Sequence, residues 1–281
     1  MKKIFYLLLS VATLFVSCED YEAINPHAKK GLLPGKFSIS ETKQVQFSQG
    51  NLQARPCDST WRFAPHQYDT IGSNGDCYEA WNFDRHYTGW IDLFDWKYSR
   101  PYEIEDNERI LKDWGFYAIS NGGKQAGLWR TLYLEEWNYL FFERANAADL
   151  FGFGTVNGVG GIILLPDDWC TPKGLTFHAS MEDLEEENSH YVNRNGNNYS
   201  HNTYDYKQWK EMEKSGAVFL PDAGGVYGNE CLLDNSGNYW TLSESDSGVA
   251  YVIRFNKGYF YPTNRKPWSW GGSVRLVRPC R

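Results

Sequence analysis

Several short segments near the start of the predicted domain alternate apolar and polar residues, as half-buried β-strands do. The alternating apolar positions are Phe37 and Ile39, then Val45 and Phe47, and then Trp61 and Phe63. A turn signal, Ser-Gln-Gly-Asn at residues 48–51, separates the second pair from the third. Residues 35–72 are therefore predicted to form two or three strands joined by turns.

Two later segments have helical spacing instead. In residues 128–147 the apolar side chains that share one helical face are Leu134, Trp137 and either Leu140 or Phe141. In residues 204–216 the shared face carries Tyr206, Trp209 and Met212. The second helix has Thr203 as its predicted cap and Gly216 as its predicted end.

Apolar runs flank the second helix and complete the predicted fold. Residues 155–169 contain an apolar strand that ends at Pro166, with a Gly-rich hairpin turn before it, and residues 217–225 repeat the pattern of an apolar run followed by Leu-Pro-Asp. Further strands are expected in residues 237–262 and 273–278, and long loops in 72–113 and 176–202. This order of elements predicts an α+β domain with two helices packed on one mostly antiparallel, twisted sheet.

The first residues are predicted to lie outside that domain. Lys2 and Lys3 precede an apolar run over residues 4–16, which is typical of a secretory signal and too short for a comfortable transmembrane helix. The run ends at Cys18 in a sequence that resembles a bacterial lipobox. We expect residues 1–17 to be a lipoprotein signal peptide, residues 18–35 a lipidated tether, and residues 36–281 the folded domain.

Acidic residues follow Cys18 directly and resemble the surface-export signals of lipoproteins from the Bacteroides group. We therefore expect a lipid anchor in the outer membrane, palmitate included, with the domain on the cell surface. The chain has 281 residues and a formal net charge of −7. Because a negative protein is not drawn to phosphate backbones, a nucleic-acid partner is not expected.

The cysteines are consistent with an exported protein, in which disulfides can form. Apart from Cys18, the cysteines are Cys57, Cys77, Cys170, Cys231 and Cys280. We expect one or two disulfides, with Cys57 and Cys77 as the favoured pair because they lie in adjacent loop-like segments. Cys280 is left with either Cys170 or Cys231 as a partner, since spacing does not choose between them.

Three motifs carry a resemblance to known families. "LWRTLYLEEWNYL" (residues 128–140) is similar to the T-x-x-EW helix entry of formylglycine-generating-enzyme-like proteins, and "NYWTLSES" (238–245) with "GGSVRLVR" (271–278) resembles the end of the same group. Residues 35–278 look closer still to exported Bacteroides-type proteins related to the Fibrobacter succinogenes major paralogous domain family. The resemblance implies a single C-type lectin-like domain. Tyr133 stands where the enzyme-like pattern has a capping Thr, so a slightly frayed helix start is expected.

The chemistry of these relatives does not carry over. Formylglycine-generating enzymes use two closely spaced cysteines with copper near the C-terminal part of the domain, and residues 239–278 contain no cysteine. The calcium-binding triplets of C-type lectins are absent, and the turn with Asp234, Asn235 and Asn238 is interpreted as Asx-stabilised. The six His residues show no metal-ligand spacing. We expect no catalysis, no metal and no cofactor.

The C-terminal strands carry the candidate site. In C-type lectin-like domains the last strands and their loops form the usual ligand face, so the resemblance implies that rings, guanidinium groups and amides there bind a glycan or a protein. The candidate ligand-binding residues are Tyr251, Arg254, Tyr259, Tyr261, Asn264, Arg265, Trp268 and Trp270. The alternative is that these rings pack beneath long loops as a satellite core. Two other functions stay open: an oxidase relative, or a structural adhesin or surface-assembly component.

Overall fold

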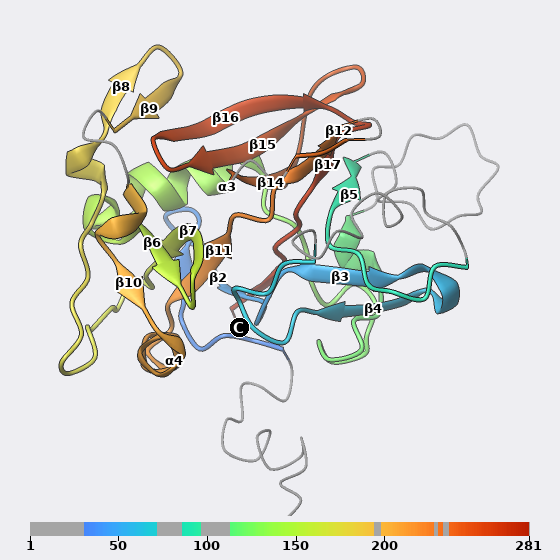
Figure 1. The fold of residues 1–281 in the computed structure, drawn as a ribbon, viewed down its shortest axis with the longest axis horizontal. Helices are drawn as coiled ribbons and strands as arrows, with labels where there is room; N and C mark the ends of the chain where they lie inside the picture. Colours follow the sequence, from blue (N-terminus) through green and yellow to red (C-terminus); the bar gives the residue numbers. More distant parts are fainter. Residues whose placement is uncertain are drawn as a thin grey trace, which may run out of the picture.

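The computed structural model describes residues 31–71, 86–96, 113–193, 198–227, 230–232 and 236–280. These residues form a mostly β structure with two short α-helices and several sheets, which confirms the predicted α+β class. Within this part of the chain, each helix is either too short or too polar to span a membrane. Figure 1 shows a sheet at the top, smaller sheets below it, and helices on two sides.

The strands are divided among five sheets in the described residues. The largest sheet runs in the order β14 (Ser236–Asp246), β15 (Val249–Asn256), β16 (Tyr259–Pro267), β9 (His190–Val192) and β8 (Glu185–Glu187). A four-stranded sheet runs in the order β10 (Thr203–Tyr204), β6 (Phe151–Val156), β7 (Val159–Leu164) and β11 (Val218–Pro221). Its β10–β6 pairing is parallel, and its other pairings are antiparallel.

Three smaller sheets complete the structure. One contains β13 (Glu230–Leu232), β12 (Gly225–Tyr227), β17 (Gly271–Gly272) and β5 (Phe94–Asp95); another contains β1 (Phe37–Ser38), β2 (Gln44–Phe47) and β18 (Val277–Pro279); and the last contains β3 (Leu52–Arg55) and β4 (Thr60–Phe63). The prediction of one continuous sheet is therefore wrong. Many strands have only two to four residues, so the chain changes sheets often.

The burial pattern of β14 shows why several sheets are needed. Tyr239 and Trp240 are neighbours in the chain, yet each is buried in a different apolar cluster. The Tyr239 cluster also contains the rings of Phe153 and Phe255, whereas the Trp240 cluster contains Trp114. Because adjacent strand residues point to opposite faces, β14 can serve two cores only where both of its faces are covered.

The first predicted helix is confirmed as α3 (Leu134–Asn138), which continues as a π-helical turn, η6 (Tyr139–Glu143). The predicted apolar face is buried at Trp137, Leu140 and Phe141. Figure 1 shows α3 beneath β15 and β16, so the helix covers one face of the largest sheet. None of the helices in the described residues covers the opposite face of that sheet.

The start of α3 is capped rather than frayed. The side chain of Tyr133 supplies no cap, as expected. The Glu136 carboxylate accepts a hydrogen bond from the Tyr133 N–H at 2.9 Å, and the Ser243 Oγ accepts one from the Leu134 N–H at 2.9 Å. A serine 109 positions away thus satisfies a helix-end donor, which no local pattern could reveal.

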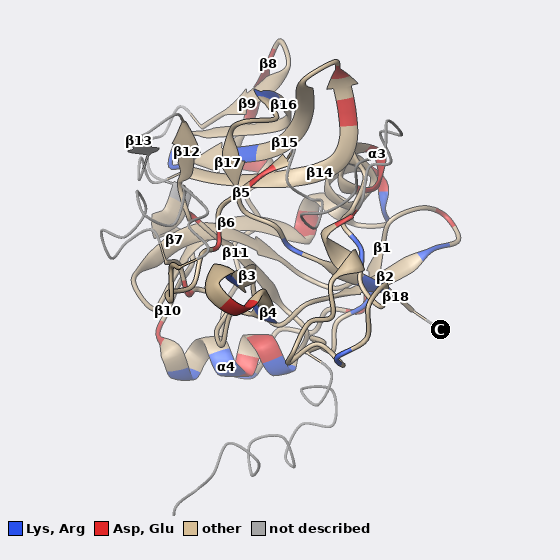
Figure 2. Cartoon of the chain, turned by 90° about the vertical axis from the view of Figure 1, so that its right-hand side faces the viewer, with Lys and Arg blue, Asp and Glu red and all other residues tan. Residues whose placement is uncertain are grey.

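The second helix, α4 (Tyr206–Lys214), has its cap two residues later than predicted. The Asp205 carboxylate accepts from the Gln208 N–H at 2.8 Å, while Thr203 belongs to β10. Gly216 follows the helix with φ +100°, a conformation that favours glycine. Figure 2 shows both basic and acidic positions along α4, as on a solvated helix surface.

Two further hairpins can be compared with the prediction. The predicted Gly-rich turn is confirmed between β6 and β7, where Asn157 and Gly158 both have positive φ. The segment predicted as a polar loop instead contains the β8–β9 hairpin, whose turn has Asn188 at φ +56°. The acidic run of residues 185–187 therefore forms the edge strand of the largest sheet.

The chain entering the domain is packed rather than extended. Leu33, at the end of the predicted tether, is buried in the core and its N–H donates to the Phe47 carbonyl at 2.9 Å. Gly35 lies against Gly216, because a Cβ there would meet the Gly216 oxygen at 2.4 Å. Residues 31–35 thus belong with the fold, while Cys18 and the earlier residues lie outside the described part.

The cysteines that can be compared with the prediction are Cys57, Cys170 and Cys280. Each carries a free thiol, with Cys57 and Cys170 exposed. The suggested Cys170–Cys280 bond is not formed. Because Cys57 and Cys280 are free, the favoured Cys57–Cys77 bond and the alternative Cys231–Cys280 bond are not formed either. Cys77 and the side chain of Cys231 themselves lie outside the described residues.

A buried carboxylate predicts how stability depends on pH. Burial raises the pKa of Asp92 to about 6, although its carboxylate accepts from the Ile71 N–H at 2.9 Å. Asp92 therefore contributes its full stability below the unfolded pKa near 3.9, and this is lost as pH rises through about 6. We expect Asp92→Asn, which keeps the acceptor, to be more stable than wild type at pH 8 by on the order of 2 kcal/mol.

The measurement is urea unfolding of both proteins from pH 4.5 to pH 8. The advantage of the Asn variant should stay constant from pH 8 to about pH 6 and shrink below that, because the wild-type carboxyl then becomes protonated in the folded state. An advantage of equal size at both ends of this range would contradict the assignment.

Candidate functional site

The predicted site residues lie on the β15–β16 hairpin. Its turn is the predicted Asn256-Lys257-Gly258, where the Asn256 Oδ1 accepts from the N–H groups of Gly258 and Tyr259 at 3.1 and 3.0 Å. Val252 and Phe255 are buried in the core, as predicted. The exposed or half-exposed side chains of the hairpin include five of the predicted residues: Tyr251, Arg254, Tyr259, Tyr261 and Arg265.

One row of side chains crosses four strands of the largest sheet. The guanidinium carbon of Arg254 (β15) lies 5.7 Å from the ring centroid of Tyr261 (β16). The Tyr261 ring stacks on His190 (β9) with centroids 4.8 Å apart, and the His190 Nε2 lies 4.0 Å from a carboxylate oxygen of Glu187 (β8). We call these four residues the outer row, because they stand on the face opposite α3.

The outer row is widened by the neighbouring tyrosine. Tyr259 stacks on Tyr261 with centroids 5.9 Å apart and is 42% exposed, which makes it one of the most exposed large rings in the described residues. Tyr261 therefore has both His190 and Tyr259 as stacked ring neighbours. The row thus brings together phenol, imidazole, guanidinium and carboxylate groups. Such an arrangement suits a polar, hydrogen-bonding ligand.

Tyr251 and Arg265 lie toward the other end of the same hairpin. They are cross-strand partners, and the Arg265 guanidinium lies 3.6 Å from a carboxylate oxygen of Asp246 at the end of β14. Both side chains of that ion pair are well exposed. The pair is therefore screened by water, so it contributes little to stability and stays accessible to a ligand.

Three predicted residues do not belong to this face. Trp270 is only 4% exposed, and the ammonium of Lys266 lies 4.7 Å from the centroid of one of its rings. Trp268 is half-buried and stacks on the buried Trp96 with centroids 5.3 Å apart. The predicted exposure is therefore wrong for Trp270, whereas Trp268 is only partly buried against the same apolar cluster, as in the satellite-core interpretation.

Asn264 is displaced by an irregularity in the hairpin. A register shift between Val252 and Arg254 makes Asn264 the cross-strand partner of the buried Val252. The amide oxygen of Asn264 is buried and has no hydrogen-bond partner. Strict alternation from Tyr259 and Tyr261 would place Asn264 on the opposite face of β16, and the register shift instead makes it the partner of Val252.

The edges of the largest sheet determine whether another chain could add a strand to it. The edge strand β8 is three residues long and entirely glutamate, a composition that blocks pairing with another chain. On the other edge, the N–H of Trp240 donates to the Ser273 carbonyl at 3.0 Å and that of Leu242 to the Leu132 carbonyl at 2.9 Å. Among the described residues, the edges at β8 and β14 are thus short or occupied, while β9 pairs with β16 only at Tyr259 and Phe260.

No family model, curated protein or solved structure matches this chain. The function must therefore be argued from the geometry alone.

The prediction missed two members of the outer row, His190 and Glu187. The signal for them was the Asn-Ser turn at residues 188–189 between the acidic run and His-Tyr-Val, which is a hairpin pattern.

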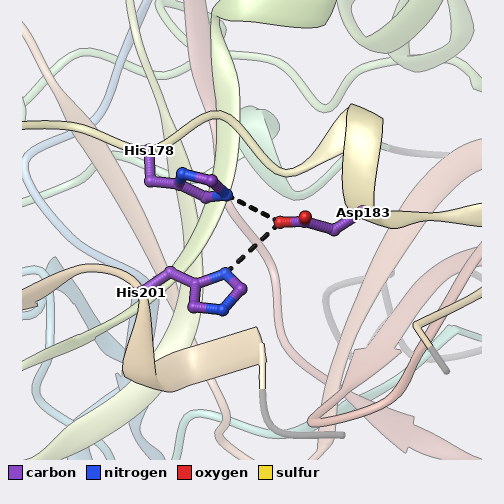
Figure 3. A group of neighbouring side chains, drawn as sticks. All are labelled: His178, Asp183 and His201. Atoms are coloured by element: carbon purple, nitrogen blue, oxygen red, sulfur yellow. Dashed lines mark hydrogen bonds and ion pairs between the residues drawn. The ribbon is translucent and has the colours of Figure 1, made fainter. Parts of the chain in front are cut away.

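A second group was missed because its members are far apart in sequence. His178, Asp183 and His201 converge at one point, and Figure 3 shows both imidazoles directed at the same carboxylate.

Proposed function

We propose that this chain is a cell-surface lipoprotein that presents one non-catalytic, ligand-binding domain of the C-type lectin-like class. Cys18 carries the lipid that anchors it to the outer membrane, and the residues that follow act as the tether. The ligand is a glycan, or failing that a protein, held against the hairpin of β15 and β16. The bound groups are Arg254, Tyr259 and Tyr261, with Tyr251 and Arg265 beside them.

The observation that carries this proposal is the outer row. A β-sheet face without a ligand is usually occupied by solvated polar side chains, whereas here a guanidinium, three rings and a carboxylate are aligned across four strands. Rings offer a large contact area at low entropy cost, and charged groups at their edges fix the orientation of hydroxyl-bearing ligands. The short, acidic edge strand favours this role over a structural one.

An array experiment tests the proposal. The mature chain with Cys18 replaced by Ser is labelled and applied to arrays of glycans and of host surface proteins. We expect saturable binding to a related group of glycans, competed by the same free sugars. Saturable binding only to proteins on the array would show that the ligand is a protein. The absence of saturable binding on both arrays would contradict the proposal.

The anchor is tested separately. Cells expressing wild type and Cys18→Ser are grown with labelled palmitate, and the protein is recovered from the outer membrane. We expect label and membrane association in wild type and neither in Cys18→Ser, because the thiol is the acceptor of the lipid. Protease treatment of intact cells then reports exposure of the domain. Label that persists in the variant would exclude Cys18 as the anchor.

A further inference from the structure

Three polar side chains meet at one point on the side of the domain, away from the outer row. The His178 Nε2 lies 2.7 Å from the Asp183 Oδ2, and the His201 Nδ1 lies 3.3 Å from the same oxygen. The two imidazole rings are 4.7 Å apart and nearly perpendicular. One ligand atom from each residue lies within 4.8 Å of the others, with the side chains directed inward (Figure 3).

The backbone around this group is held by a buried asparagine. The Asn202 Oδ1 accepts from the His178 N–H at 2.8 Å, and the Asn202 Nδ2 donates to the carbonyls of His178 at 2.9 Å and Phe153 at 2.7 Å. The carbonyl of Asn202 accepts from the Thr155 N–H at 2.7 Å. The residue beside His201 thus clamps the backbone of His178, and both are fastened to β6.

Asp183 is fixed to the same strand from the other side. Ser180 is buried, its N–H donates to the Phe151 carbonyl at 3.0 Å, and its Oγ accepts from the Phe153 N–H at 2.9 Å. The Ser180 carbonyl then accepts from the Asp183 N–H at 3.1 Å within the 3₁₀ turn η8 (Met181–Asp183). All three side chains are therefore positioned by β6, although 23 residues separate His178 from His201.

The donor set decides which ion fits. Imidazole nitrogens with one carboxylate oxygen suit a borderline transition ion such as Zn²⁺, whereas Ca²⁺ and Mg²⁺ prefer oxygen ligands throughout. Tetrahedral Zn²⁺ with ligands at ~2.05 Å places its donor atoms roughly 3.3 Å apart. The His201–Asp183 separation of 3.3 Å already has this value, and the His178–Asp183 separation of 2.7 Å must lengthen by roughly 0.6 Å.

We propose that His178, Asp183 and His201 bind one Zn²⁺ ion. The side chains of His178 and His201 are 51% and 34% exposed, so water reaches the ion and completes its coordination. The ion cross-links the loop that follows β7 to the segment that precedes β10. Since β8 begins two residues after Asp183, the ion also secures the hairpin that supplies His190 to the outer row. The proposal stands independently of the ligand that this row binds.

Calorimetric titration of the mature chain with ZnCl₂ tests this site. We expect one Zn²⁺ per chain in wild type, with no competition from excess Ca²⁺ or Mg²⁺. His178→Gln/His201→Gln should weaken binding by at least about tenfold, since even outer partners of metal ligands change affinity by that much. His66→Gln is the matched control, because the His66 Nδ1 lies 3.2 Å from Asp69 in a pair with a single imidazole.

A second readout follows the ion's effect on folding. Zn²⁺ should raise the unfolding temperature of wild type and of His66→Gln but leave that of the double variant unchanged, because only a bound ion stabilises the native state. Equal Zn²⁺ affinity in wild type and the double variant would show adventitious binding elsewhere. That result, or a wild type without Zn²⁺ binding, would overturn the proposal.

Discussion

Gln67→Leu is expected to destabilise the domain by about 4 kcal/mol, the largest effect we predict for a single side chain. Gln67 is completely buried, and its amide makes four hydrogen bonds. Its Oε1 accepts from the Phe219 N–H at 2.7 Å and from Arg275 at 2.8 Å. Its Nε2 donates to the Ala217 carbonyl at 3.1 Å and to Glu213 at 3.0 Å.

The reason for so large an effect is that Gln67 completes the free edge of β11. The amide bonds to Ala217 and Phe219 as a neighbouring strand would, while Arg275 donates to the Phe219 carbonyl at 2.6 Å. Burial lowers the pKa of Arg275 to about 10, so this guanidinium depends strongly on its acceptors. Leucine would remove the side-chain partner of two backbone groups and one of the acceptors of a buried cation, each loss costing about 1–3 kcal/mol.

Urea unfolding of Gln67→Leu beside Gln53→Leu measures this effect. Gln53 is equally buried, but its amide oxygen accepts from the Arg62 Nε at 2.8 Å on the half-exposed β3–β4 hairpin. We expect the Gln53 variant to lose only about 1 kcal/mol. Losses of the same size in both variants would mean that the edge of β11 does not need Gln67.

Local patterns predicted the local elements well. Helical spacing around Trp137 and Trp209 located both helices, and the Gly-rich turn located the β6–β7 hairpin. What failed depended on distant residues. Ser243 caps α3 from another strand, and no periodicity indicates that Tyr239 and Trp240 serve separate cores.

The candidate site shows the same limit. Tyr259 and Tyr261 were predicted correctly as accessible because strict alternation holds from the turn to that point. Beyond it, a register shift changes the alternation and makes Asn264 the partner of the buried Val252. His178 and His201 come together only because β6 organises two loops, and such convergence leaves no spacing to recognise in the sequence.

The second large effect concerns the ligand face. Tyr259→Ala/Tyr261→Ala removes the two rings at the centre of the face, and we expect it to weaken binding of the ligand found on the arrays by roughly 100-fold. This corresponds to about 1.4 kcal/mol for each ring, in the range of central interface aromatics. The tyrosine rings lie on the uncovered face of the sheet, so unfolding by urea should change little.

The matched control removes a similar exposed area elsewhere. Tyr206 on α4 and Tyr227 on β12 are 39% and 58% exposed and belong to other elements. Tyr206→Ala/Tyr227→Ala should therefore bind the ligand as wild type does. Comparison of the two double variants distinguishes an effect of this particular face from an effect of removing any two surface tyrosines.

The most direct test is a titration of that ligand, by calorimetry, into wild type and these two double variants. Our account predicts that only Tyr259→Ala/Tyr261→Ala loses affinity, by roughly two orders of magnitude. Equal dissociation constants for all three proteins would contradict the assignment of the ligand to the outer face of β15 and β16.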